Sequence, residues 1–204
     1  MGHLRALGHS RRRARLVVMV KNPLPGRVKT RLGRDIGMVP AAWWMRHQQR
    51  DLLRRLRDPR WELVLAVSPD TSVQGRAWPS DLTRIAQGNG DLGDRMGRIL
   101  RGRGVWRWSG PTCIIGSDIP AISRPHIARA FAALGRQDGV IGPALDGGYW
   151  LIGFNGVSPP PPGLFHDVRW SSRYTLDDTI ASMPGRRIAM VDRLADVDRA
   201  RDLG

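Results

Sequence analysis

The chain has 204 residues, 41% of them apolar, and no polar linker long enough to divide it, so one domain with a substantial core is expected over residues 16–204. A formal charge of +15 favours anionic partners but does not choose among them. All but two of the 33 basic residues are arginine, a bias that a GC-rich genome produces without selection for binding. The sole cysteine, Cys113, excludes a disulfide framework or a cysteine metal site within one chain.

Residues 1–15 form an arginine-rich segment that predicts a flexible basic tail. The apolar run behind this tail is too short for the core of a signal peptide, and no stretch approaches the roughly 20 apolar residues of a membrane span. A cytoplasmic protein is therefore expected, and nothing in the sequence chooses between a monomer and a homodimer. Nucleic acid is not the expected partner, because nucleic-acid motifs and aromatic stacking platforms are missing.

Apolar runs of strand length recur along the chain, and such near-continuous runs are typical of strands that are covered on both faces. They span residues 16–20, 63–67, 112–116, 140–143, 149–154 and 188–191. Segments with helical spacing lie between them, at residues 40–56, 92–101, 125–134 and 172–183. This alternation predicts an α/β fold with an open, mostly parallel sheet flanked by helices, whose ligands bind beyond the carboxyl ends of the strands.

The first predicted strand leads into a cationic loop, residues 21–32, with arginine or lysine at alternating positions. Prolines restrict the backbone and Gly26 allows a tight turn with exposed N–H groups, so the loop has the composition of a preorganised polyphosphate site. It matches neither a Walker loop nor a dinucleotide-binding turn, and a solvated basic turn is the plainer interpretation. The candidate nucleotide-binding residues of this loop are Lys21, Pro25, Gly26, Arg27, Lys29, Thr30 and Arg31.

A second nucleotide-binding segment is predicted where a glycine-containing turn leads into the helix at residues 92–101. The candidate residues there are Gly90, Asp91 and Arg95, because a helix start with free N–H groups can receive a base or a phosphate. Acidic residues in a first helical turn also stabilise the helix through its macrodipole, so a purely structural role is the alternative.

Asp118 follows the predicted strand at residues 112–116 and is the candidate metal ligand. A carboxylate at a strand tip can hold a divalent cation against phosphate oxygens, because Mg²⁺ accepts one or two carboxylates and takes its remaining ligands from water and phosphate. The alternative is an aspartate that caps a helix or closes a turn. Near the C-terminus, Asp196 and Asp198 lie on the same side of an extended segment, and they either complete this metal site or cap a short helix.

Asp146 precedes Gly147, Gly148 and Tyr149 at another strand boundary. The glycines permit a positive φ and a close approach of backbone to ligand, while the carboxylate can orient an acceptor, bind metal or act as a base. Asp-Gly is also a common hairpin signal. The hairpin is the favoured interpretation of this segment by itself, and it is compatible with a site.

Six ordered motifs together resemble one family, although each is weak alone. They are K-x-P-x-P-G-R-V-K-T-R-L at residues 21–32, G-D-L-G-D-R-M at 90–96, I-G-S-D-I-P at 115–120, G-P-A-L-D-G-G-Y-W-L-I-G at 142–153, W-S-S at 170–172 and D-V-D at 196–198. The set is similar to bacterial glycosyltransferase-A-like proteins of an uncharacterised family. Members are often labelled glycosyltransferases of arsenosugar biosynthesis and are distantly similar to phospholactate guanylyltransferase.

The resemblance implies the glycosyltransferase-A nucleotide-diphospho-sugar fold, a Rossmann-like sheet with one antiparallel strand, and a divalent metal held by Asp118. In related nucleotidyltransferases the last acid of the D-V-D-like motif also meets the metal, which corresponds to Asp198 here. Arg199 stands where a threonine usually follows that acid, and Leu145 replaces a commonly polar neighbour of the D-G-G motif. The candidate acceptor-binding residues are Asp146, Gly147, Gly148, Tyr149, Trp170 and Ser171.

The leading hypothesis is a transferase that uses Mg²⁺ or Mn²⁺ and moves a glycosyl group from a nucleotide sugar to a small-molecule acceptor. Lys29, Asp118 and Asp146 are the candidate catalytic residues, because cations stabilise the leaving phosphate and Asp146 faces the acceptor. The density of cations in the first loop instead favours an NTP, joined to a phosphorylated or carboxylated metabolite with release of pyrophosphate. A non-catalytic protein that binds nucleotides or nucleic acid is the third hypothesis.

Overall fold

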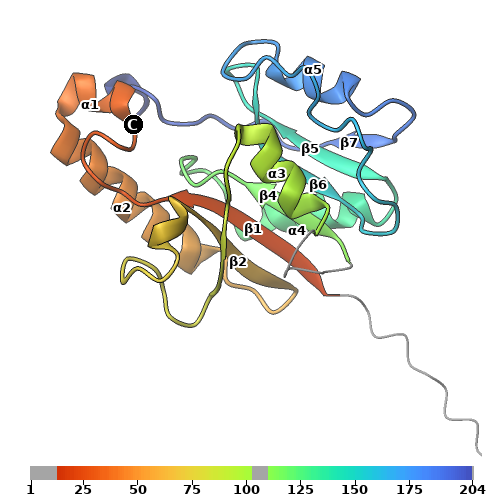
Figure 1. Ribbon diagram of the computed structural model, residues 1–204, viewed down its shortest axis with the longest axis horizontal. Coiled ribbons are helices and arrows are strands. Elements are labelled where there is room, and N and C mark those ends of the chain that lie inside the picture. Colours follow the sequence, from red (N-terminus) through yellow and green to blue (C-terminus); the bar gives the residue numbers. More distant parts are fainter. Residues whose placement is uncertain (1–12, 103–109, 204) are drawn as a thin grey trace, which may run out of the picture.

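The computed structural model describes residues 13–102 and 110–203 (Figure 1). Most of the tail predicted for residues 1–15 lies outside the described residues, and β1 (Ala14–Lys21) begins before the predicted domain start at residue 16. Strands and helices then alternate along the chain. Within the described residues, no helix is both long and apolar enough to cross a membrane.

The described strands form a seven-stranded sheet in the order β3-β2-β1-β4-β6-β5-β7. The strand β6 (Tyr149–Phe154) pairs antiparallel with both of its neighbours, and every other pair is parallel. The expected mixed, mostly parallel sheet with one antiparallel strand is therefore confirmed. The other strands are Trp61–Ser68 (β2), Thr83–Ala86 (β3), Thr112–Ile115 (β4), Gly139–Pro143 (β5) and Ile188–Met190 (β7).

The central strands are buried on both faces, because their side chains alternate between two hydrophobic layers. In β1, Leu16, Val18 and Val20 pack in one layer and Val17 packs in the other. Solvent reaches almost none of these four side chains. Burying a side chain of this size contributes about 1.5–3 kcal/mol, so a run rich in valine and leucine is most stable as a covered strand.

The helices that cover the sheet in Figure 1 are Met38–Arg55 (α2), Leu92–Leu100 (α3), Arg124–Leu134 (α4) and Thr175–Ala181 (α5). Leu52 of α2 and Ile127 of α4 belong to the hydrophobic layer on one face of the sheet. Met96 of α3 and Leu176 of α5 belong to the layer on the other face. All four predicted helical segments are thus present, although α5 is shorter than predicted because residues 172–174 form turns.

Three short elements of the described residues were not predicted: β3, α1 and the 3-10 helix Asp70–Ser72 (η1). β3 is an edge strand in which only Ile85 is buried, so it lacks the apolar run that marks the other strands. The helix α1 (Thr30–Ile36) begins inside the segment predicted to be a loop, and the prediction is wrong for residues 30–32. Lys29 precedes α1 with φ 44° and ψ 48°, a left-handed conformation that turns the chain into the helix.

The strands β1, β4 and β5 run in the same direction, so the loops that follow them leave the same edge of the sheet. The C-terminal segment reaches this edge as well, where Ala144 and Leu194 form a parallel bridge. The loop between β5 and β6 joins an antiparallel pair, which confirms the hairpin predicted around Asp146. Four segments that are distant in sequence therefore meet beyond the carboxyl ends of the parallel strands.

Candidate functional site

The ammonium group of Lys29 joins the cationic loop to two acidic residues from other parts of the chain. Its Nζ donates to Asp118 Oδ2 at 2.8 Å and lies 3.4 Å from Asp198 Oδ1. Arg31 Nη1 donates to the other oxygen of Asp198 at 2.6 Å. These direct contacts bring the loop, Asp118 and Asp198 together at one rim of the sheet.

Buried residues on either side of Lys29 fix its position. Val28 packs against α2, and Leu32 of α1 packs in a cluster with Val197, so the loop is anchored at both ends. The Val197 N–H lies 3.4 Å from the Asp118 carbonyl oxygen, which ties the C-terminal segment to the end of β4. As a result only 8% of the Lys29 side chain is exposed, although it carries a full positive charge.

The two carboxylates of the D-V-D segment lie in opposite electrostatic environments. Burial by itself would raise the pKa of Asp198, but the hydrogen bond from Arg31 and the charge of Lys29 outweigh burial and lower that pKa below its ordinary value. The pKa of Asp196 is raised, first by burial and then by the negative charges of Asp118 and Asp198. Asp196 therefore lies in a partly buried setting with carboxylates nearby, whereas Asp198 lies against two cations.

A cavity of about 680 Å³ opens beside Lys29, between the loop at residues 26–31 and the ends of β1 and β4. We call it the cationic cavity, because Lys21, Arg27, Lys29 and Arg31 line it. Its walls also contain Gly26, Thr30, Gln87, Ser117, Asp118 and Asp198. Its size and charge suit the phosphates of a nucleotide.

A second cavity, of about 340 Å³, lies next to the first. We call it the acidic cavity, because Asp118, Asp146 and Asp196 line it together with Tyr149 and Trp170. Met19, Leu92, Gly116, Asp118 and Ser171 line both cavities. A ligand in the cationic cavity and a second ligand in the acidic cavity would therefore meet at the carboxylate of Asp118.

Most of the residues predicted to bind nucleotide or acceptor line these cavities. The predicted nucleotide-binding residues that do not line the cationic cavity are Pro25, Gly90, Asp91 and Arg95. Among the predicted acceptor residues, only Gly147 does not line the acidic cavity. Gly147 shapes the hairpin instead: its φ is 89°, and a Cβ there would lie 2.6 Å from the backbone of Arg173.

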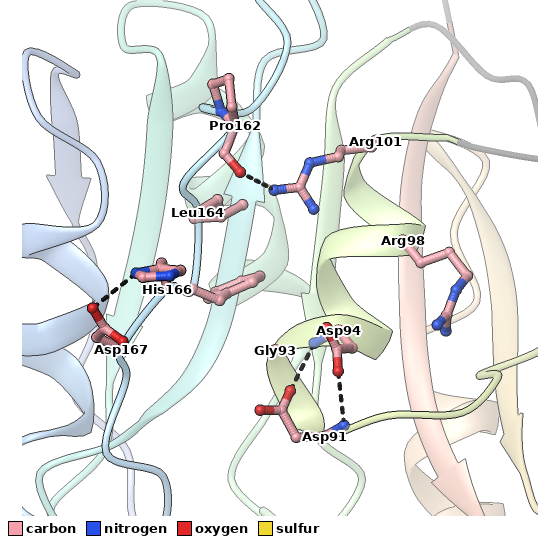
Figure 2. Close-up of a pocket in the computed structure, with 10 residues that line it drawn as sticks. Asp91, Gly93, Asp94, Arg98, Arg101, Pro162, Leu164, His166 and Asp167 are labelled. Atoms are coloured by element: carbon pink, nitrogen blue, oxygen red, sulfur yellow. Dashed lines mark hydrogen bonds and ion pairs between the residues drawn. The ribbon is translucent and has the colours of Figure 1, made fainter.

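Asp91 belongs to the beginning of α3 and faces a different cavity, which Figure 2 shows. Its Oδ1 accepts from the Asp94 N–H at 2.8 Å, and Asp94 Oδ2 accepts from the Asp91 N–H at 3.1 Å. This reciprocal pair is a capping box, so Asp91 satisfies backbone donors at the start of the helix. Arg95 donates from Nε to the Gly90 carbonyl oxygen at 3.0 Å, which holds the preceding turn.

Two buried glutamines support the rim and were not predicted. Gln87 Nε2 donates to the carbonyl oxygens of Val20 at 3.1 Å and Ala66 at 2.8 Å, and so joins the ends of β1 and β2. Gln49 Nε2, on α2, donates to the Lys21 carbonyl oxygen at 3.1 Å and lies 3.4 Å from Ser117 Oγ. Both amides are almost fully buried, and a buried amide needs hydrogen-bond partners, which here depend on the tertiary fold and not on the local sequence.

The structure also shows which of the acidic residues cap a helix or hold a turn. The helical turn η2 (Ala200–Asp202) is capped by Asp202, whose Oδ2 accepts from the N–H groups of Asp198 and Arg199, so Asp198 is not the cap. Arg199, which stands in place of threonine, lies against Asp35 of α1. Asp146 Oδ1 accepts from the Gly148 N–H at 2.9 Å, which orients this carboxylate within its hairpin.

The carboxylates of Asp118 and Asp198 fit a hard divalent cation. Both approach one positive centre, Lys29 Nζ, and both offer only oxygen ligands. About a third of each side chain is exposed, so water and phosphate can reach them. Within the described residues no group of three acidic, histidine or cysteine side chains is arranged as a ready metal site. Two carboxylates nevertheless suffice for Mg²⁺ when phosphate oxygens and waters complete the coordination.

The fold and this rim define an α/β protein of the nucleotide-diphospho-sugar transferase type. A structure from Desulfovibrio desulfuricans G20, described as a candidate nucleotide-diphospho-sugar transferase, matches with a TM-score of 0.82 and 30% sequence identity, over 94% of this chain and 85% of that chain. Residues 51–172 match the family described as "Uncharacterized protein conserved in bacteria (DUF2064)", and the chain belongs to this family. No protein with a curated description matches the sequence.

More distant structures share the fold alone. Glucosyl-3-phosphoglycerate synthase from Mycobacterium tuberculosis, in complex with Mn²⁺, UDP and glucosyl-3-phosphoglycerate, has a TM-score of 0.52 and 13% identity over 94% of this chain and 74% of that chain. 4-Diphosphocytidyl-2C-methyl-D-erythritol synthase from Anaerococcus prevotii DSM 20548 has a TM-score of 0.54 and 9% identity over 93% of this chain and 94% of that chain. One fold thus carries both a sugar-transferring and a nucleotide-transferring enzyme.

Proposed function

We propose that the protein is a metal-dependent glycosyltransferase, which moves a sugar from a nucleoside diphosphate to a small-molecule acceptor. The observation that carries this proposal is the contact of Lys29 with Asp118 and Asp198 where two cavities of opposite charge meet. Such a boundary suits a reaction in which a sugar leaves a diphosphate on one side and joins a second substrate on the other.

In the proposed reaction the cationic cavity holds the diphosphate. Arg27, Lys29 and Arg31 stabilise the negative charge that develops on the leaving diphosphate, and their positions on an anchored loop reduce the reorganisation that this requires. Asp118 and Asp198 would hold Mg²⁺ or Mn²⁺, which, when bound, neutralises the diphosphate oxygens. Because Lys29 contacts both carboxylates, the ammonium group has to move toward the phosphates as the donor binds.

The acidic cavity holds the acceptor in this proposal. Asp146 accepts the hydrogen bond of the acceptor hydroxyl group and takes its proton, since its carboxylate is oriented by the Gly148 N–H and lines the cavity. Tyr149 and Trp170 provide aromatic surface at the wall. The sugar is thereby brought between Asp118, on the diphosphate side, and Asp146, on the acceptor side.

The comparisons support this assignment at the level of the class. The relative with 30% identity is described as a candidate nucleotide-diphospho-sugar transferase. A protein with the same fold is seen with UDP and Mn²⁺, which are the kinds of ligand proposed here for the cationic cavity. Neither comparison specifies the sugar, the nucleobase or the acceptor for this chain.

Nucleotidyl transfer from an NTP is the second candidate function. It is favoured by the number of cations in one cavity, because Lys21, Arg27, Lys29 and Arg31 line it together and a leaving pyrophosphate needs more positive charge than a nucleoside diphosphate held by metal. The fold is compatible with this reaction, as the cytidylyl-type synthase shows for its own chain.

The test is to incubate the purified protein and Mg²⁺ or Mn²⁺ with UDP-, GDP- and ADP-sugars and the four NTPs, in the presence of mixed sugars and polyols. Glycosyl transfer releases a nucleoside diphosphate, whereas nucleotidyl transfer releases pyrophosphate. Asp118→Asn should remove the product in either case, and Asp167→Asn is the matched control, because Asp167 is 88% exposed and lies outside both cavities. Metal-independent nucleotide binding without product would instead support a non-catalytic binding protein.

A further inference from the structure

We propose that the acidic cavity selects an acceptor that is rich in hydroxyl groups and carries no phosphate or carboxylate group. This inference rests on the proposed function, and it deepens that function by naming the substrate class. Its basis is the contrast between the side chains that line the two cavities.

The described residues that line the acidic cavity include three carboxylates, from Asp118, Asp146 and Asp196, and no lysine, arginine or histidine. The cationic cavity, by contrast, has four lysine or arginine side chains in its wall. A protein site for a phosphorylated metabolite normally supplies cationic side chains or several N–H donors to the phosphate. Asp118 is paired with Lys29, but Asp146 and Asp196 still give the acidic cavity a negative charge, so an anionic acceptor would be repelled there.

The nearest cations are already engaged. Lys29 contacts Asp118 and Asp198, and it lines the cationic cavity but not the acidic one. Two arginines flank the Trp170–Ser172 segment, but both face elsewhere. Arg169 forms an ion pair with Asp178, and Arg173 lies over the Tyr174 ring.

The remaining wall of the acidic cavity is largely apolar. The rings of Tyr149 and Trp170 lie at this wall together with Met19 and Met96. Aromatic surface can pack against the C–H face of a sugar ring, while carboxylates accept hydrogen bonds from its hydroxyl groups. The cavity of about 340 Å³ has room for one small molecule of this kind. An uncharged monosaccharide or polyol therefore fits both the charge and the surface of the cavity.

The experiment uses matched pairs that differ by one anionic group: glucose and glucose 6-phosphate, glycerol and glycerol 3-phosphate, and methyl glucoside and methyl glucuronide. Binding of each compound to the intact protein is measured by ligand-observed NMR without a sugar donor, in excess inorganic pyrophosphate, so that the cationic cavity is occupied. We expect the uncharged member to bind at least about tenfold more tightly than its anionic partner in one pair or more. If no uncharged member binds more tightly than its partner, the inference is overturned.

A variant localises the effect. Asp146→Asn removes one carboxylate from the acidic cavity and should reduce the discrimination between the members of a pair, whereas Asp167→Asn, at an exposed position that does not line the cavity, should leave it unchanged. An equal change in both variants would mean that the preference comes from the net charge of the protein, and it would overturn the assignment of the preference to the acidic cavity. The proposed function is tested separately, by release of a nucleoside diphosphate from the donors. Selective binding of uncharged compounds without that release would reject the glycosyltransferase and leave the cavity's selectivity standing.

Discussion

The cationic and acidic cavities are neighbours that share the carboxylate of Asp118, but different segments of the chain line them. Residues 26–31 are the longest continuous part of the wall of the cationic cavity; they supply three of its four cations and are anchored to α2 and to the C-terminal segment. The acidic cavity is assembled from the ends of β4 and β5, the hairpin at Asp146, and the segments around Trp170 and Asp196. A local sequence motif can therefore specify phosphate binding, whereas acceptor choice depends on long-range packing.

The largest expected effect is that of Asp118→Asn, which acts on both cavities. Removing this negative charge should reduce metal-dependent nucleotide binding by about a hundredfold or more, because one of the two proposed metal ligands is lost. The folded structure should persist, since the side chain is about one third exposed. Calorimetric titration with Mn²⁺ and nucleoside diphosphates, beside Asp167→Asn, measures this. Unchanged affinity would make Asp118 a structural residue.

Lys29→Met should impair the function of the cationic cavity and leave ligand binding in the acidic cavity unchanged. The rate of donor cleavage should fall by about a hundredfold, because a cation is missing at the leaving diphosphate, while binding of uncharged acceptors stays the same. Mn²⁺ binding without nucleotide should become stronger, since Asp118 and Asp198 lose the ammonium group that competes for them. Electron paramagnetic resonance counts free Mn²⁺ directly. Weaker Mn²⁺ binding would show that Lys29 helps to build the metal site.

Gln87→Met tests whether nucleotide binding in the cationic cavity depends on the hydrogen bonds that join the ends of β1 and β2. The substitution keeps the length of the side chain but removes the amide that bonds to Val20 and Ala66. The free energy of unfolding should fall by about 1–3 kcal/mol, because two buried carbonyl oxygens lose a partner. Nucleotide binding should weaken and acceptor binding should not, since Gln87 lines only the cationic cavity. Urea unfolding and both titrations are needed, and equal losses in both cavities would contradict this division.

The smallest expected effects are those of Asp196→Asn and Asp198→Asn on the free energy of unfolding, which should have opposite signs. The lowered pKa of Asp198 means that its charge stabilises the fold at neutral pH, and that this contribution is lost as the pH falls below the ordinary value of 3.8 and through the lowered pKa. The raised pKa of Asp196 means that its charge costs stability once the pH rises above 3.8. Each difference should be under about 1 kcal/mol, because the groups are partly exposed.

Urea unfolding at pH 7 should therefore find Asp198→Asn less stable than the wild type and Asp196→Asn more stable. At pH values below both carboxyl pKa values, the differences that come from charge should disappear. If both variants lost stability equally at pH 7, the two carboxylates would not lie in opposite environments.

Much of the fold could be predicted from the sequence, because buried strands carry their signal locally. β6 was predicted with its observed bounds, since every residue of that run is apolar or glycine and is flanked by turn residues. β3 has only Ile85 buried and gives no such signal. The helix α1 was missed because its start depends on the left-handed backbone of Lys29, which a lysine rarely adopts.

In the candidate site, too, features that depend on the tertiary fold could not be predicted from the sequence. Acidic residues at strand ends could be placed together, because parallel strands end at one edge of the sheet. The role of Gln49 and Gln87 could not be predicted, since their partners are backbone oxygens on other elements. Asp91 had the sequence context of a ligand site, and the structure shows a capping box there. A capping box and a ligand-binding helix start share the same residue types, so only the tertiary arrangement distinguishes them.

The central claim is that Asp118, Asp198 and the loop at residues 26–31 hold a metal and a diphosphate together. Crystals soaked with Mn²⁺ and UDP, GDP or ADP test it most directly through the anomalous signal of manganese. We predict manganese in direct contact with carboxylate oxygens of Asp118 and Asp198, with Lys29 turned toward the phosphates in the cationic cavity. A nucleotide bound elsewhere, with Lys29 still in contact with both carboxylates, would contradict the account.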